Sequence, residues 1–171
     1  EHLFDDLAAG CRALESTLAR AGCVPPGLVR QTIEAQALTG LVDNAVFSGD
    51  LARAGSFAAA LRTRLPGLSK DALIEAHQVL IEATMREGDF DAARASLEAL
   101  RLARAPRAVA LSFEAQIYWF EGRVGEARQA FEHLLMRHGD YCHGLTIEND
   151  LAVMCLALGD LAAAEEMSRR S

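Results

Sequence analysis

The sequence predicts an all-α fold of about nine helices, and three observations support that prediction. Ala and Leu supply 32 and 24 of the 171 residues, and both residue types are favourable in helices. Thr, Val and Ile, whose branched side chains favour strands, together supply only 19 residues. No stretch of the chain alternates apolar and polar residues between turn signals, as a half-buried strand would.

A turn pattern repeats along the chain and predicts helical hairpins. Four glycines, separated by 39, 34 and 37 residues, each lie between two apolar helical stretches: Gly49, Gly88, Gly122 and Gly159. A glycine in this position accepts the left-handed conformation that ends a helix. Asp follows three of these glycines and can cap the next helix. The residue five after each glycine is Ala, which is small enough for two helices to cross closely: Ala54, Ala93, Ala127 and Ala164.

Proline and glycine separate the elements. The first helix covers about residues 3–21 and ends before Pro25-Pro26-Gly27, while Pro66-Gly67 and Pro106 separate later segments. The following helices are predicted to pair as about 28–48 with 50–65, 70–87 with 90–104, 107–121 with 124–138, and 145–158 with 161–170. The predicted organisation is a single array over residues 1–171, with a leading helix and linker (1–27) and hairpins at 28–66, 69–105, 107–139 and 144–171. We interpret the leading helix as half of an upstream unit, in a piece of a longer protein.

Composition excludes several classes of protein. The formal net charge is −7 and the Arg residues are scattered among acids, which disfavours direct nucleic-acid binding. No apolar run approaches the roughly 20 residues of a membrane span, and no secretory signal is evident. Four widely spaced cysteines, Cys11, Cys23, Cys142 and Cys155, are expected to be reduced core residues. We therefore expect a cytoplasmic protein.

Catalytic and metal-binding patterns are missing from the sequence. The chain has no phosphate-binding loop, no Gly-x-Ser-x-Gly elbow and no His-Glu-x-x-His pair. His133, His138, Cys142 and His143 could each ligate zinc, but the first two are five residues apart and point to different sides of a helix. We predict that the chain is not an enzyme and holds no metal or cofactor.

The repeated unit resembles the tetratricopeptide repeat (TPR) family, a helix-turn-helix of about 34 residues. The resemblance covers about residues 35–171. The best match is Leu73 to Leu100 with its Gly88-Asp89-Phe90 turn, followed by Asn149-Asp150-Leu151-Ala152 with Leu158-Gly159-Asp160. The unit lengths are uneven, and the usual glycine of the first helix is replaced by Val42, Ile81, Ala115 and Ala152. The resemblance implies a divergent array, folded as a right-handed superhelical stack of hairpins.

The resemblance also implies a binding face on the first helix of each hairpin. Carried over unit by unit, the partner-binding residues are Gln36, Thr39 and Asp43, then Glu75, Gln78 and Glu82, then Ser112, Gln116 and Trp119, and finally Asn149 with Val153. The Asn amide both donates and accepts, which suits a peptide bond. The acids predict a peptide or protein partner that is basic or amphipathic. Trp119, in the cluster Ile117-Tyr118-Trp119-Phe120, is either an interface anchor or a core residue.

The sequence leaves two functions open. The first is a scaffold for protein–protein interaction that binds its partner on the concave face. The second is an inducer-sensing domain, because the chain also resembles the repeat regions of large bacterial ATP-dependent transcription regulators. An open groove lined by amides and acids would favour the scaffold, whereas a pocket closed by aromatic residues would favour the sensor. Apolar residues at the array ends, at Leu3-Phe4 and Leu161, could let the chain form a homodimer.

Overall fold

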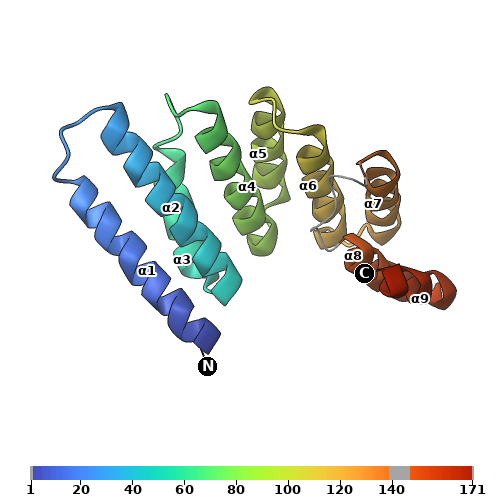
Figure 1. Cartoon of the computed structure of the whole chain (residues 1–171). Helices are drawn as coiled ribbons and strands as arrows, with labels where there is room; N and C mark the ends of the chain where they lie inside the picture. Colours follow the sequence, from blue (N-terminus) through green and yellow to red (C-terminus); the bar gives the residue numbers. More distant parts are fainter. Residues whose placement is uncertain (1, 139–146, 171) are drawn as a thin grey trace. The chain divides into compact units, whose positions relative to one another are not determined.

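The computed structural model describes residues 2–138 and 147–170, and every secondary-structure element in those ranges is an α-helix (Figure 1). The nine helices are α1 (His2–Ala21), α2 (Leu28–Ser48), α3 (Leu51–Arg62), α4 (Lys70–Glu87), α5 (Phe90–Leu102), α6 (Arg107–Phe120), α7 (Val124–His138), α8 (Ile147–Ala157) and α9 (Leu161–Arg170). The all-α class and the number of helices are therefore confirmed. The right-handed superhelical stacking remains a prediction.

The predicted turn chemistry is present at all four repeat glycines. Gly49, Gly88, Gly122 and Gly159 have φ between 77° and 80°. At each turn the following residue donates its backbone N–H to a carbonyl five residues earlier, as Asp89 does to Thr84 at 2.9 Å. A carboxylate of Asp50, Asp89 and Asp160 then accepts a backbone N–H from the next helix. Arg123 occupies the equivalent position in the third turn, where the sequence has no Asp.

The helix ends agree with the predicted ranges except at α3. That helix ends at Arg62, three residues before the predicted end at about residue 65. Leu65 precedes Pro66, and the proline ring disfavours a helical conformation at the preceding residue. The chain therefore leaves the helix early and turns through Pro66-Gly67, where Gly67 has a φ of 85°.

The chain forms two compact units, Glu1–Ala103 and Arg104–Ser171. In unit 1, α1 packs on α2, the hairpins α2–α3 and α4–α5 form as predicted, and α4 packs against both α2 and α3. The core of this unit is built from residues such as Leu38, Val42, Leu61 and Leu80. Each of these side chains is at most 2% exposed.

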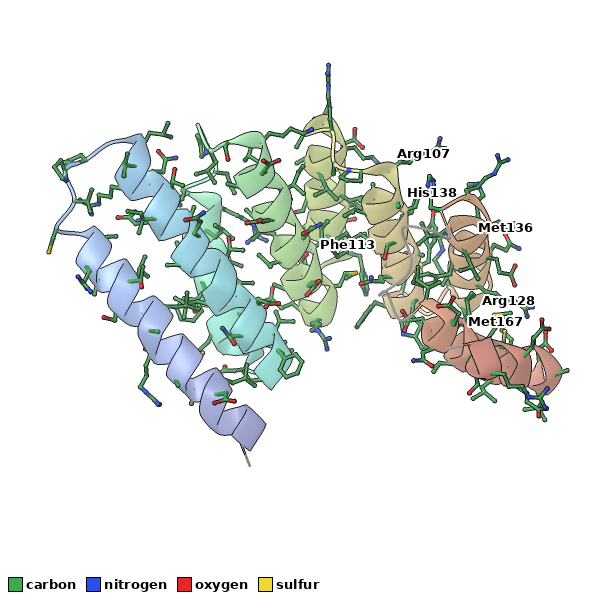
Figure 2. The ribbon with its side chains drawn as sticks, viewed as in Figure 1. Arg107, Phe113, Arg128, Met136, His138 and Met167 are labelled. Carbon is green, nitrogen blue, oxygen red and sulfur yellow. The ribbon has the colours of Figure 1, made fainter. Side chains whose placement is uncertain are left out.

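Unit 2 contains the hairpins α6–α7 and α8–α9, with α7 packed against α8. Phe131, Leu134, Ile147 and Leu151 form its core and are almost completely buried. Arg128 of α7 donates to Glu132 at 2.7 Å and to Asp160, before α9, at 3.0 Å. The contact with Asp160 links α7 to the turn of the second hairpin, and Figure 2 labels Arg128 in this unit.

The small residues predicted at the helix crossings are all buried: Ala54, Ala93, Ala127 and Ala164. The cysteine prediction is only partly correct, because Cys155 is buried but Cys23 is exposed and Cys11 is intermediate. Cys23 follows the end of α1, in the turn before Pro25, where no helix covers it. Cys142 lies outside the described residues, as do the side chains of Leu3 and Phe4. No described helix has the length and apolar character that crossing a membrane requires.

Candidate functional site

In unit 1, the predicted binding residues lie on two helices that pack side by side. Gln36, Thr39 and Asp43 belong to α2, and Glu75, Gln78 and Glu82 belong to α4. The spacing of three and four residues places each set on one helix face. Gln36, Asp43 and Glu75 are exposed, whereas Thr39, Gln78 and Glu82 are half-buried. The six residues therefore lie on two adjacent helices of unit 1, α2 and α4.

Two of these acids, Asp43 and Glu82, interact unfavourably. Burial raises the pKa of the Glu82 carboxyl above its usual value, and the negative charge of Asp43 raises it further. Arg86 offsets part of the increase in the pKa, because its positive charge favours the carboxylate. The α2–α4 surface consequently carries an acidic pair that a cation from a partner would relieve.

In unit 2, the predicted residues of α6 do not all face the same environment. Ser112 is buried, and its hydroxyl accepts a hydrogen bond from the Gln116 amide at 3.2 Å. Trp119 is half-buried and packs against the core cluster of the unit. Asn149, near the start of α8, is exposed.

A hollow of about 300 Å³ lies between α6 and α8. Its lining comprises Gln116, Trp119 and Phe120 from α6, Phe131 from α7, and Asp150, Val153 and Met154 from α8. Phe131 and Met154 are buried and form its base, whereas Phe120 and Val153 are exposed at 41% and 51%. In unit 1 the corresponding helices, α2 and α4, pack directly against each other. The hollow of unit 2 is thus walled in part by aromatic side chains.

Asp150 supplies the carboxylate of this hollow. Burial raises the pKa of its carboxyl above the usual value of an aspartate. None of the described residues that line the hollow is basic. The site therefore combines aromatic surface, one amide and one partly desolvated acid, a set that suits a cation with an apolar stem.

The hollow brings together part of the predicted site. It includes Gln116, Trp119 and Val153, but neither Ser112, which accepts the Gln116 hydrogen bond, nor Asn149, which lies beside Asp150 in the sequence. Sequence reasoning missed Asp150 and Phe120 as site residues. The available signal was their position, since each directly follows a predicted site residue, Asn149 or Trp119.

The described residues contain no group of three or more His, Cys, Asp or Glu placed to hold a metal ion. His133 and His138 belong to α7. Cys142 and His143, the other two zinc-capable residues, lie outside the described part of the chain.

Comparison of the chain with protein-family models, with curated proteins and with solved structures finds no match. The resemblance to TPR arrays therefore remains a prediction from the sequence.

Proposed function

We propose that the chain is a protein-interaction module that binds a basic or amphipathic peptide segment of a partner protein. The observation that carries this proposal is the hollow between α6 and α8, where Trp119, Gln116 and Asp150 line one space. Aromatic residues supply much of the binding energy at protein interfaces because they bury a large area with few rotatable bonds.

A Lys or Arg side chain fits the chemistry of this hollow. Its aliphatic stem would lie along Trp119 and Val153, and its charged end would pair with Asp150. Gln116 can donate to or accept from the peptide backbone. The charge of the partner would also stabilise the ionised form of Asp150, so that partner binding and proton release are coupled.

Unit 1 has a second negatively charged surface, in addition to the hollow that Asp150 lines in unit 2. Asp43 and Glu82 repel each other there, and a cationic residue near both would remove that repulsion. Both units thus favour positively charged partners, each through its own surface.

The proposal is tested by selecting peptides from a random display library against the intact protein. We expect the selected peptides to be enriched in Lys or Arg flanked by apolar residues. Their binding can be followed by fluorescence, because Trp119 is the single tryptophan of the sequence. Asp150→Asn should weaken binding about tenfold, since it removes one charge-assisted contact. Binding should also weaken as the pH falls through the raised pKa of Asp150.

Glu148→Gln is the matched control, because Glu148 lies in the same turn of α8 and is not part of the lining of the hollow. It removes one negative charge and should change the affinity less than twofold. Equal losses in both variants would mean that only net charge matters and would contradict the site. Selected peptides without basic residues, or undiminished binding to Asp150→Asn, would contradict the proposal as well.

The aromatic walls of the hollow also favour the second function, a small-molecule sensor. A free aromatic or alkyl amine, such as phenethylamine, would bind the same residues. Quenching of Trp119 by phenethylamine at micromolar concentration, with no peptide selected, would favour the sensor over the interaction module.

A further inference from the structure

A second hollow in unit 2 is lined by positively charged and imidazole side chains. It measures about 370 Å³ and its lining residues are Arg107, His133, Arg137 and His138. α6 begins at Arg107 and α7 ends at His138, so the antiparallel hairpin places both ends together (Figure 2). His133 and Arg137 are four residues apart and lie on the same face of α7.

Many arginines outside this hollow are paired with acids. Arg30, Arg53, Arg64, Arg123, Arg128 and Arg169 each lie within ion-pair distance of a carboxylate. Among the residues that the structure describes, no acidic side chain pairs with Arg107 or Arg137, and no acid lines this hollow. The described residues of the hollow therefore carry positive charge and no negative charge, on a chain whose formal net charge is −7.

The donor set of the hollow matches an oxyanion with several oxygen atoms. Each guanidinium can form two parallel hydrogen bonds to one anion, and each imidazole can add one N–H donor. A carboxylate offers two oxygens, whereas a terminal phosphate group offers three and carries more charge. The start of α6 adds the positive end of a helix dipole beside Arg107. The number of donors therefore favours a phosphate group over a carboxylate.

We propose that the hollow of Arg107, His133, Arg137 and His138 binds the phosphate or pyrophosphate group of a small phosphorylated molecule. Its volume lies in the range of small-ligand sites. The site is separate in its residues from the hollow of Trp119 and Asp150, and it binds a ligand of the opposite charge. The unit would then respond to a phosphorylated metabolite independently of its peptide partner.

The test is isothermal titration calorimetry, which measures the affinity of the intact protein for pyrophosphate, inorganic phosphate and citrate at low ionic strength. We expect pyrophosphate to bind more tightly than phosphate, and citrate to bind at least tenfold more weakly than pyrophosphate. Arg107→Gln and Arg137→Gln should each weaken pyrophosphate binding about tenfold or more, and Arg137→Lys should weaken it less than Arg137→Gln. The circular dichroism spectrum of each variant verifies that it is folded.

Arg62→Gln is the control, because Arg62 is an exposed arginine of α3 in unit 1, outside this hollow. It should leave the affinity within twofold of the starting protein. No binding of pyrophosphate, equal losses in all the Arg→Gln variants, or citrate binding as tight as pyrophosphate binding would each overturn the proposal. The peptide test uses different residues and a different probe, so either proposal can fail alone.

Discussion

Glu34 and Glu82, both in unit 1, have carboxyl groups in opposite electrostatic environments. Glu34 of α2 accepts hydrogen bonds from Arg30 at 2.7 Å and from Arg64 at 2.9 Å. These two bonds, first that from Arg30, hold the pKa of Glu34 below its usual value. Glu82 of α4 has its pKa raised by burial and by Asp43. The first carboxylate therefore stabilises the folded unit when it is ionised, and the second destabilises it.

Glu82→Gln should stabilise the protein at pH 7. A raised pKa in the folded state means that the unfolded state loses its proton first as the pH rises. The ionised Glu82 therefore costs stability above its folded pKa, and this cost vanishes below the ordinary glutamate pKa of 4.5. Since Glu82 is only half-buried, we expect a gain of roughly 0.5 kcal/mol at pH 7 and none near pH 4. Urea denaturation at the two pH values measures the difference.

Glu34→Gln should have the opposite effect on stability and serves as the comparison. It should destabilise the protein at pH 7, because Arg30 and Arg64 lose their charged acceptor, and the loss should shrink as the pH falls through the lowered pKa of Glu34. A Glu82→Gln variant that is less stable than the starting protein at pH 7 would mean that Glu82 already has a stabilising partner.

The residues carried over from the repeat resemblance include some that line the hollow of unit 2 and omit others. Gln116 and Trp119 are three residues apart on α6, and the structure places both at the same hollow. Asp150 could not be predicted in this way, because its role depends on how far it is buried. That burial depends on how α8 packs within unit 2, which no local pattern encodes.

At the scale of the elements, local chemistry determined the boundaries. Eight of the nine helices end within about two residues of their predicted limits, because glycine, proline and Asp caps act within one turn of the chain. α3 ends early because Pro66 restricts Leu65, an effect that the apolar periodicity of the helix conceals. The turn glycines carry the strongest of these local signals.

Gly88→Ala should destabilise the protein by about 1 kcal/mol. Gly88 has a φ of 80°, and an added Cβ would meet no atom within 4 Å. The loss of stability therefore comes from holding alanine at a positive φ, and no steric clash contributes to it.

Gly10→Ala is the matched control, since Gly10 lies inside α1 and its Cβ would also meet nothing within 4 Å. It should stabilise by roughly 0.5–1 kcal/mol because alanine favours the helix. Thermal denaturation of both variants measures the difference, and equal effects would contradict the role of Gly88.

At the scale of the whole molecule, the sequence repeat did not predict the division into two units. We interpret Pro106 as a separator between two hairpins, of the same kind as Pro66-Gly67, and the repeat continues beyond it, so the sequence predicted one array. The boundary falls at Arg104, which has a φ of 56° and is the only described non-glycine residue with positive φ. Arginine is not among the residue types that favour this conformation, so the sequence carries no signal for it. The TPR-like family, the single array and the larger regulatory protein stay predictions.

Two separate cores predict that the units unfold separately within the intact chain. Leu61 in unit 1 and Leu134 in unit 2 occupy equivalent positions of their hairpins, and both are 0% exposed. Replacing either leucine with Ala should cost its own unit about 2–5 kcal/mol. Trp119 lies in unit 2, so its fluorescence reports that unit, whereas circular dichroism reports the helices of both.

Leu134→Ala should therefore lower the urea concentration at the midpoint of the Trp119 fluorescence transition. In the circular dichroism curve, only the part that reports unit 2 should shift to lower urea concentration. Leu61→Ala should leave the fluorescence midpoint unchanged. In the circular dichroism curve, it should shift the part that reports unit 1 to lower urea concentration. In the starting protein the two signals should not coincide, which excludes a single two-state transition. Coincident transitions that shift together in both variants would mean that the two cores unfold as one cooperative structure, as neighbouring repeats coupled through their interfaces do.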